Sequence, residues 1–340
     1  MDLDIFLLLT AVFLVSCGGT WGLGRLALRY SLLDVPNQRS SHNLPTPRGG
    51  GLALLLGFYL GGGYLVWNGG IHIPHILGLA GCGLGIAIAG FLDDYFRLSA
   101  GKRIFIHFLC VFVAVRFFIS DNALFLHWGN VIPLFLVRFL FVVGLVWLLN
   151  LYNFMDGIDG LAGMEAISVA LGAGIILFFT GETANYLPLL QVLAAASIGF
   201  LVWNWPPARI FMGDAGSGFL GFFFGIFALL TASSTSLNPW TWSILLGAFV
   251  VDATVTLMVR IRRGEKFYEA HRSHAYQILA RRFGSHGKVT LGYMGMNWFF
   301  LFPLACLSAY KPDYGLFLVI FSYALLAILC ILAGAGTKND

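Results

Sequence analysis

Charged residues are scarce in this 340-residue sequence, at 11%, compared with about 25% in an average soluble domain. That scarcity argues against a soluble globular protein. Hydrophobic residues make up 59% of the chain, which also contains 42 Gly and 32 Phe. Small residues such as glycine let helices pack closely in lipid. The composition therefore indicates an integral membrane protein.

Several familiar site motifs are also missing. No GxxxxGK[ST] string occurs, which excludes a P-loop for nucleotide phosphates. The five cysteines all lie in apolar runs without CxxC or His-rich spacing, so neither a disulfide framework nor a zinc site is indicated. We expect the cysteines to be packing residues.

Long hydrophobic runs are abundant instead. At about 20 residues per membrane-spanning helix, we identify eleven runs, near residues 3–28, 49–67, 76–92, 104–119, 131–149, 160–180, 186–204, 215–232, 239–259, 290–310 and 314–334. Because backbone polar groups in lipid must be satisfied within a segment, these runs are predicted to be helices. We expect an all-α, polytopic membrane protein with about 11 transmembrane helices, forming a single integral membrane domain over residues 1–340.

Lysine and arginine are concentrated in alternate loops of this map. The loops near residues 29–48, 97–103, 209 and 260–288 hold most of the basic residues, whereas the other loops hold few. Positive residues mark the cytoplasmic side of a membrane protein. We therefore predict a periplasmic N-terminus and a cytoplasmic C-terminus. We expect no nucleic-acid partner.

Five aspartates fall on the same predicted side, although acidic residues contribute little to orientation. Asp93, Asp94, Asp156, Asp159 and Asp214 all lie in cytoplasmic loops or at the adjoining ends of spans. Any one of them could be a solvated loop residue. Convergence of five in a chain with so few acids favours an active site in the cytoplasmic loops.

The adjacent pair Asp93 and Asp94 ends the third run and is followed by the basic residues Lys102 and Arg103. Neighbouring carboxylates repel, so one keeps its proton to higher pH. This pattern suits a general base beside a metal ion. The alternative is a merely charged helix end, for which aspartate has the wrong sign for the helix dipole.

Two further loops carry oxygen ligands beside glycine. In NFMDGIDGLAG, three-residue spacing would put Asn153, Asp156 and Asp159 on one face of a helix, where they could bind substrate hydroxyl groups or a hard cation. In GDAGSG, Asp214 could hold a divalent cation while Gly213 and Ser217 border backbone donors that cradle phosphate.

Basic loops complete the candidate site. The string HRSHAYQ contains Arg272 and His274, and RSSHNLPTPRGGG contains His42 and Arg48. Such groups bind diphosphate. The alternative is a basic loop lying near anionic lipid.

Asp252 lies inside a predicted span, the ninth run. Burial against lipid would cost about 2.5–3.5 kcal/mol, so we expect it to face the bundle and to have a partner. A buried acid of this kind supports an alternative function, an ion-coupled membrane transporter or lipid flippase.

Four strings, DDYFR, NFMDGIDGLAG, PPARIFMGDAGSG and HRSHAYQ, occur in this order on one predicted side. Together they resemble the polyprenyl-phosphate N-acetylhexosamine-1-phosphate transferases of glycosyltransferase family 4, which include O-antigen-initiating enzymes and phospho-N-acetylmuramoyl-pentapeptide translocase. The resemblance covers the chain from about Asp34 to Gln277.

The resemblance implies transfer of an N-acetylhexosamine or N-acetyl-6-deoxyhexosamine 1-phosphate from a UDP-sugar to undecaprenyl phosphate, with release of UMP. Such a reaction initiates O-antigen or another surface polysaccharide at the bacterial cytoplasmic (inner) membrane. The implied cofactor is Mg²⁺, with Mn²⁺ as an alternative. The implied partners are a UDP-N-acetylated sugar, undecaprenyl phosphate and membrane lipid, and a homo-oligomer is left open.

Carried over by motif, Asp93 is expected to deprotonate the lipid phosphate, with Asp94 supporting it, while Asp214 binds magnesium. The full predicted set is as follows: catalytic, Asp93, Asp94, Asp156 and Asp159; substrate-binding, His42, Arg48, Lys102, Asn153, Gly213, Ser217, Arg272 and His274; metal, Asp214.

Two departures from the family pattern matter. Tyr276 and Gln277 stand where the family often has further histidines, and Asn43 and Arg48 stand where the pentapeptide translocase has Lys and Thr. The second difference argues against a muramoyl-pentapeptide donor. The RSSH and PTPRGGG strings look more like the O-antigen-initiating branch.

Overall fold

A computed structural model describes residues 3–30, 33–36, 44–69, 73–96, 98–119, 133–183, 186–266 and 271–337. The predicted substrate-binding residue His42 lies outside these residues. The helices are α1 (Leu3–Arg29), α2 (Gly51–Trp67), α3 (Ile73–Phe96), α4 (Ala100–Phe118), α6 (Leu134–Phe154), α7 (Leu161–Phe179), α8 (Leu187–Asn204), α9 (Asp214–Ala232), α10 (Pro239–Leu245), α11 (Gly247–Arg262), α12 (Ala275–Phe283), α13 (His286–Met296), the π-helix η2 (Asn297–Leu301), α14 (Phe302–Tyr310), the 3₁₀ turn η3 (Pro312–Tyr314) and α15 (Gly315–Ala333).

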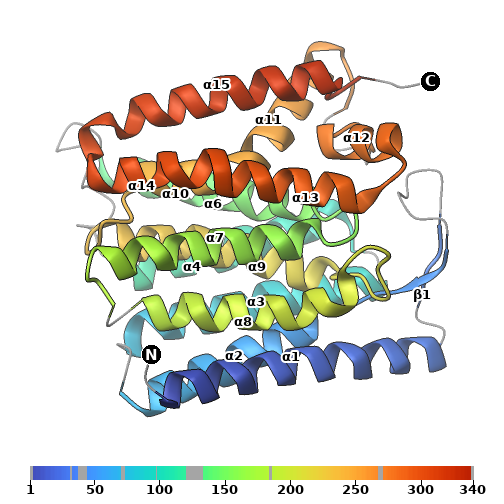
Figure 1. Cartoon of the computed structure of the whole chain (residues 1–340). Helices are drawn as coiled ribbons and strands as arrows, with labels where there is room; N and C mark the ends of the chain where they lie inside the picture. Colours follow the sequence, from blue (N-terminus) through green and yellow to red (C-terminus); the bar gives the residue numbers. More distant parts are fainter. Residues whose placement is uncertain are drawn as a thin grey trace.

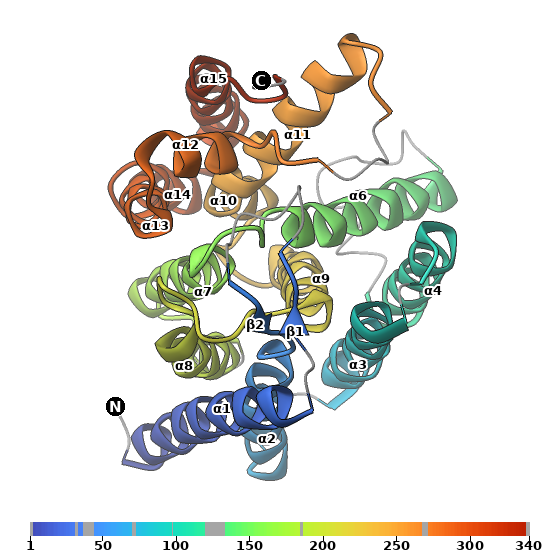
Figure 2. The ribbon, with the colours of Figure 1, turned by 90° about the vertical axis from the view of Figure 1, so that its right-hand side faces the viewer.

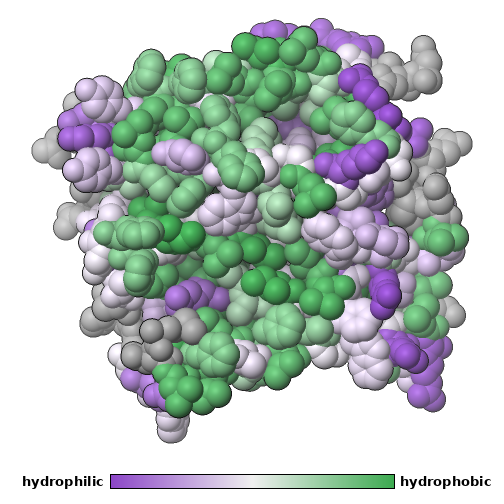
Figure 3. Space-filling view, viewed as in Figure 1, coloured by the Kyte–Doolittle hydropathy of each residue, from purple (hydrophilic) through white to green (hydrophobic). Residues whose placement is uncertain are grey.

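Most of these helices run side by side, and apolar side chains cover the middle of the molecule between two more polar rims (Figures 1 and 3). Within the described residues, eight helical segments are long and apolar enough to cross a membrane. The pair α10 and α11, bent by 73°, gives a ninth. The all-α, multi-pass prediction is confirmed, with eight or nine candidate spans. Of the other predicted spans, α2 has 17 residues and α4 carries Lys102, Arg103 and Arg116.

Helix α9 lies at the centre of the bundle (Figure 2). Nearly all of its residues are buried, including five phenylalanines, Phe219, Phe222, Phe223, Phe224 and Phe227. Glycines allow its neighbours to come close. A Cβ at Gly90 of α3 would collide with the backbone of Asp214, and one at Gly221 would lie 2.8 Å from Cα of Leu149 in α6. Close helix packing of this kind fixes where the first residue of α9 lies.

A two-residue antiparallel ribbon, β1 (Leu33–Asp34) with β2 (Thr46–Pro47), lies over the end of α9 (Figure 2). Beyond β2, Arg48 forms a parallel bridge with Phe211. The amides of Gly49 and Gly50 donate to the Phe211 carbonyl at 3.1 and 2.9 Å, and Gly51 donates to Met212 at 2.9 Å. These bonds fasten Arg48 to the segment that precedes α9.

A polar pair inside the bundle joins α7 to the π-helix η2. Asn297 Nδ2 donates to Glu165 Oε2 at 2.5 Å, and both side chains are buried. We expect Asn297→Leu to lower the free energy of unfolding by about 1–3 kcal/mol, because a buried acceptor then loses its donor. The double variant Glu165→Met, Asn297→Leu should recover most of that loss, since neither partner is then left unsatisfied. Thermal unfolding in detergent measures the stability of both variants. Equal destabilisation of the two would contradict a buried hydrogen bond between Asn297 and Glu165.

Candidate functional site

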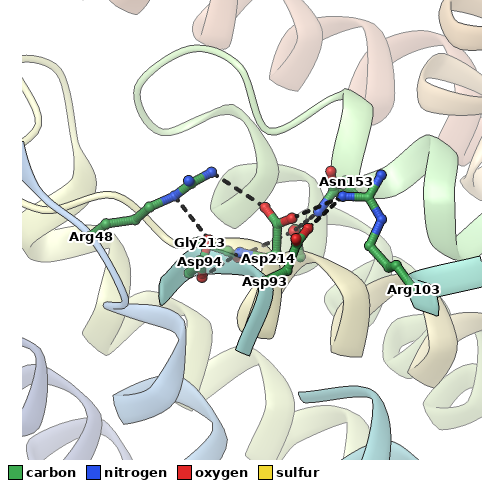
Figure 4. A network of polar contacts seen from close by, with 8 residues as sticks. Arg48, Asp93, Asp94, Arg103, Asn153, Gly213 and Asp214 are labelled. Carbon is green, nitrogen blue, oxygen red and sulfur yellow. Dashed lines mark hydrogen bonds and ion pairs between the residues drawn. The ribbon is translucent and has the colours of Figure 1, made fainter. Parts of the chain in front are cut away.

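Three carboxylates and two arginines meet at the polar end of the bundle (Figure 4). Asp93 and Asp94 come from the last turn of α3, and Asp214 begins α9. Arg48 Nε lies 3.1 Å from Asp94 Oδ1, and its Nη2 lies 3.3 Å from Asp214 Oδ1. Arg103 Nη1 donates to Asp93 Oδ2 at 2.6 Å and to Asp214 Oδ2 at 3.4 Å. We call these five residues the carboxylate cluster.

Asp94 is built into the start of α9. Its Oδ2 accepts a hydrogen bond from the Asp214 amide at 3.0 Å, which places a carboxylate oxygen at the positive end of the helix dipole. Gly213 has φ +80°, and a Cβ at this position would lie 2.6 Å from Asp94 Oδ2. Glycine is therefore required here for both conformation and space.

Asn153 joins the cluster from the last turn of α6. Its Nδ2 donates to Ser217 Oγ at 3.1 Å, and Ser217 Oγ donates to the Gly213 carbonyl at 3.2 Å. The predicted residues Asn153, Gly213, Asp214 and Ser217 thus lie together.

Asp156 lies in the loop after α6. The helix ends at Phe154, so the three-residue spacing does not place Asn153, Asp156 and Asp159 on one helical face. Burial raises the pKa of Asp156 well above its usual value; Arg48 opposes this effect, while Asp214 and Asp94 add to it. Asp156 therefore shares its electrostatic environment with the carboxylate cluster.

Asp159 faces a different feature, a cavity of about 760 Å³. Its Oδ2 accepts from the Ala208 amide at 3.1 Å, and its Oδ1 lies 3.2 Å from His286 Nδ1. The cavity is also lined by residues from four other segments, among them Thr46, Pro206, Phe211, Arg272 and Arg281. An aromatic ring, a carboxylate and two arginines are chemistry suited to a nucleotide base and its phosphates.

Of the other predicted residues that the structure describes, Arg272 lines the cavity, whereas Lys102 and His274 belong neither to the cluster nor to the cavity lining. Arg272 is exposed on the cavity wall, and Lys102 is exposed in the first turn of α4. His274 is buried and caps the N-terminus of α12, its ring stacked 4.8 Å from that of His271. Burial, with His274 and Arg260 nearby, lowers the pKa of His271 to about 3, so that ring is neutral at physiological pH.

Four residues of the site are not among those predicted from the sequence. Arg103 contacts two carboxylates of the cluster, and Phe211, Arg281 and His286 line the cavity. The sequence could have indicated Arg103, since it follows the aspartate pair in a basic stretch. Phe211 adjoins the GDAGSG motif, but an aromatic residue in a hydrophobic chain does not stand out.

The carboxylate cluster has the donors that a divalent cation requires. Oδ1 of Asp94 is buried and, within the described residues, receives no hydrogen bond, although Arg48 Nε lies 3.1 Å away. Among the described residues, no group of three or more His, Cys, Asp or Glu side chains is arranged to hold a metal ion by itself. Magnesium is commonly bound by one or two carboxylates together with substrate phosphates. The residues fit a site of that kind.

Comparisons with known proteins agree with this chemistry. The profile of glycosyl transferase family 4 matches residues 76–232. The chain is 32% identical over 267 residues to a probable undecaprenyl-phosphate N-acetylglucosaminyl 1-phosphate transferase of Bacillus subtilis, covering 75% of the chain and 71% of that relative. It is 30% identical over 286 residues to an undecaprenyl-phosphate alpha-N-acetylglucosaminyl 1-phosphate transferase of Yersinia pestis, covering 79% and 75%. A decaprenyl-phosphate N-acetylglucosaminephosphotransferase of Mycolicibacterium smegmatis is 29% identical over 318 residues, covering 83% and 77%.

Proposed function

The chain belongs to glycosyl transferase family 4, and from this we propose that it transfers N-acetylglucosamine 1-phosphate from UDP-N-acetylglucosamine to undecaprenyl phosphate. An oxygen of the lipid phosphate attacks the phosphorus that carries the sugar, and the bond from that phosphorus to UMP breaks. The product is a lipid-linked diphosphate sugar that initiates a cell-surface polysaccharide. The observation that carries the proposal is the carboxylate cluster, which lies at the polar end of an apolar helix bundle beside a cavity suited to a nucleotide.

The cluster and the cavity share one segment of chain. Arg48, in the cluster, forms a bridge with Phe211, in the cavity wall. Thr46, in the cavity wall, precedes Arg48 by two residues, and Asp214, in the cluster, follows Phe211 by three residues. A uridine base in the cavity would thus direct its diphosphate toward the aspartates, with Arg272 and Arg281 as phosphate ligands. Asp159 and His286 would bound the nucleotide side of the site.

The contacts of the cluster support a proposed role for each member. Asp93, paired with Arg103, would accept the proton of the lipid phosphate. Asp94 fixes the start of α9, and Asp214 would hold Mg²⁺ together with the substrate phosphates. When bound, the cation neutralises charge that develops on the phosphoryl oxygens. Arg48 and Arg103 supply positive charge to the same phosphates. Asp156 lies in the same electrostatic environment and remains a proposed catalytic residue.

The proposal also includes the location and the membrane topology of the protein. We propose the bacterial inner membrane as the location, with the cluster on the cytoplasmic side, about eleven spans in all, and residues 1–340 acting as a single domain. The transporter alternative loses its main support, because both carboxylate oxygens of Asp252 accept hydrogen bonds from within the protein.

Release of UMP by the purified protein tests the function. We expect UMP from UDP-N-acetylglucosamine only when undecaprenyl phosphate and Mg²⁺ are both present, with loss of activity in EDTA and recovery on adding Mg²⁺ or Mn²⁺. A panel of UDP-hexoses with and without the N-acetyl group, with mass spectrometry of the lipid product, identifies the sugar. UMP formation without lipid phosphate, or flux across liposomes without UMP, would refute the assignment.

A further inference from the structure

Tyr276 contacts the loop that carries Asp156. Its hydroxyl donates to the Phe154 carbonyl at 2.8 Å, and its side chain is fully buried. A Cβ at Gly157 would collide with the Tyr276 hydroxyl and lie 3.0 Å from Gln277 Nε2. The first turn of α12 therefore packs directly against residues 154–157.

Asp252 fixes that first turn from the other side. Its carboxylate accepts hydrogen bonds from the amides of Ala275 and Tyr276 at 2.9 and 3.0 Å, and from the hydroxyls of Tyr293 and Thr256 at 2.6 and 3.1 Å. The residue is completely buried in α11. A buried acid of this kind needs partners, and here the partners include the start of α12.

Helix α12 needs this support. It has nine residues, fewer than the roughly 12–15 at which an isolated helix becomes stable in water. The first amides of any helix lack partners within it, and Asp252 accepts from two of them with its charge at the positive end of the dipole. Within the same turn, His274 and Gln277 form a capping box. The position of Tyr276 is thus set by α11, a helix of the bundle core.

These contacts form one continuous connection from α11 through α12 to the Asp156 loop. We propose that Tyr276, held in place by Asp252, is a positioning residue that sets where Asp156 lies relative to the carboxylate cluster. Its hydroxyl is bonded to main chain and buried, so Tyr276 acts through the loop and does not touch substrate. The proposal rests on the proposed function.

Tyr276→Phe tests the proposal because it removes one hydroxyl and keeps the ring. We expect kcat for UMP release to fall about 10- to 100-fold, the order of effect that a displacement of about 1 Å produces. KM for the UDP-sugar should stay within about 2-fold of the wild-type value. A fall in kcat without a rise in KM marks the loss of an interaction made in the transition state. Tyr323→Phe is the matched control, since the Tyr323 hydroxyl also donates to a main-chain carbonyl, that of Ser243, at 3.0 Å between α15 and α10. It should keep the wild-type kcat.

A double-mutant cycle tests whether the effect passes through Asp156. In an Asp156→Asn background, adding Tyr276→Phe should cost little more, because residues that act as a unit are not additive. Full additivity, an unchanged kcat, a rise in KM alone, or an equal loss in Tyr323→Phe would each overturn the proposal.

Hydrogen exchange gives a readout that does not depend on activity. The amides of Met155 and Asp156 donate to Leu151 and Asn153 in the wild type. Tyr276→Phe should make both exchange faster, whereas Tyr323→Phe should not. If Tyr276→Phe speeds exchange but the wild-type protein forms no UMP, the proposed function is refuted while the contact between Tyr276 and the loop is supported. Unchanged exchange would overturn the positioning role.

Discussion

Replacing Asp93 or Asp214 by asparagine is expected to lower kcat for UMP release about 1000-fold. Asparagine keeps the size of the side chain but removes its negative charge, and with it either the proton acceptor or the proposed cation ligand. A general base alone contributes about 10²–10⁴. Both residues also lose the charge that pairs with Arg103. Steady-state rates of the two purified variants, at saturating UDP-sugar and lipid phosphate, measure the effect.

Asp313→Asn is a suitable control for these variants. Asp313 is an exposed acid in η3, which leads into α15, so the substitution should leave the rate unchanged. Thermal unfolding of all three proteins shows whether a loss of rate comes from a loss of fold. Near-wild-type turnover by a folded Asp93→Asn or Asp214→Asn would show that the corresponding role is assigned to the wrong residue.

Gly90→Ala should cost both stability and activity. The added Cβ would collide with the backbone of Asp214 and lie 2.5 Å from the Ala215 nitrogen, so α3 and α9 must separate. Overpacking of this kind costs about 1–3 kcal/mol. Asp93 and Asp94 lie on α3 one turn beyond the contact, so separation also moves them away from Asp214. We expect an accompanying fall in kcat of about 100-fold.

Gly81→Ala is the matched control on the same helix. A Cβ at Gly81 meets no atom of the described residues within 4 Å, and alanine is the better helix former. This variant should melt at or slightly above the wild-type temperature and keep its rate. If Gly90→Ala behaved in the same way, the close approach of α3 to Asp214 would be wrong.

Much of the fold could be predicted from the sequence, because lipid imposes one requirement on every span. Runs of about 20 apolar residues have few structural choices, and the predicted run at 290–310 is found as the continuous segment His286–Tyr310. The bend between α10 and α11 was not predicted, because residues 239–259 read as one apolar run. Two-residue strands such as β1 carry no periodic pattern to detect.

Part of the candidate site could likewise be predicted from the sequence, and part of it could not. Asp93, Asp94, Asn153 and Asp214 could be grouped from sequence, since each follows or begins an apolar run at the same predicted surface. The three-residue spacing does not separate Asp159 from Asp156, because it does not show that α6 ends at Phe154. The partners of Asp252 could not be predicted from the sequence either. Three of its hydrogen-bond donors lie 23, 24 and 41 residues further along the chain, and the fourth is Thr256 on the next turn of the same helix.

The ion pairs of the carboxylate cluster have a consequence for substrate affinity. With all three acids ionised, three negative charges face two guanidinium groups, so these five side chains carry one excess negative charge. The cluster alone therefore favours a divalent cation over an anionic nucleotide. When phosphates take Arg48 and Arg103 as partners, existing ion pairs are exchanged rather than new ones added. The net gain from an arginine–phosphate contact is therefore smaller here than for an unpaired guanidinium group, because each new ion pair replaces an existing one.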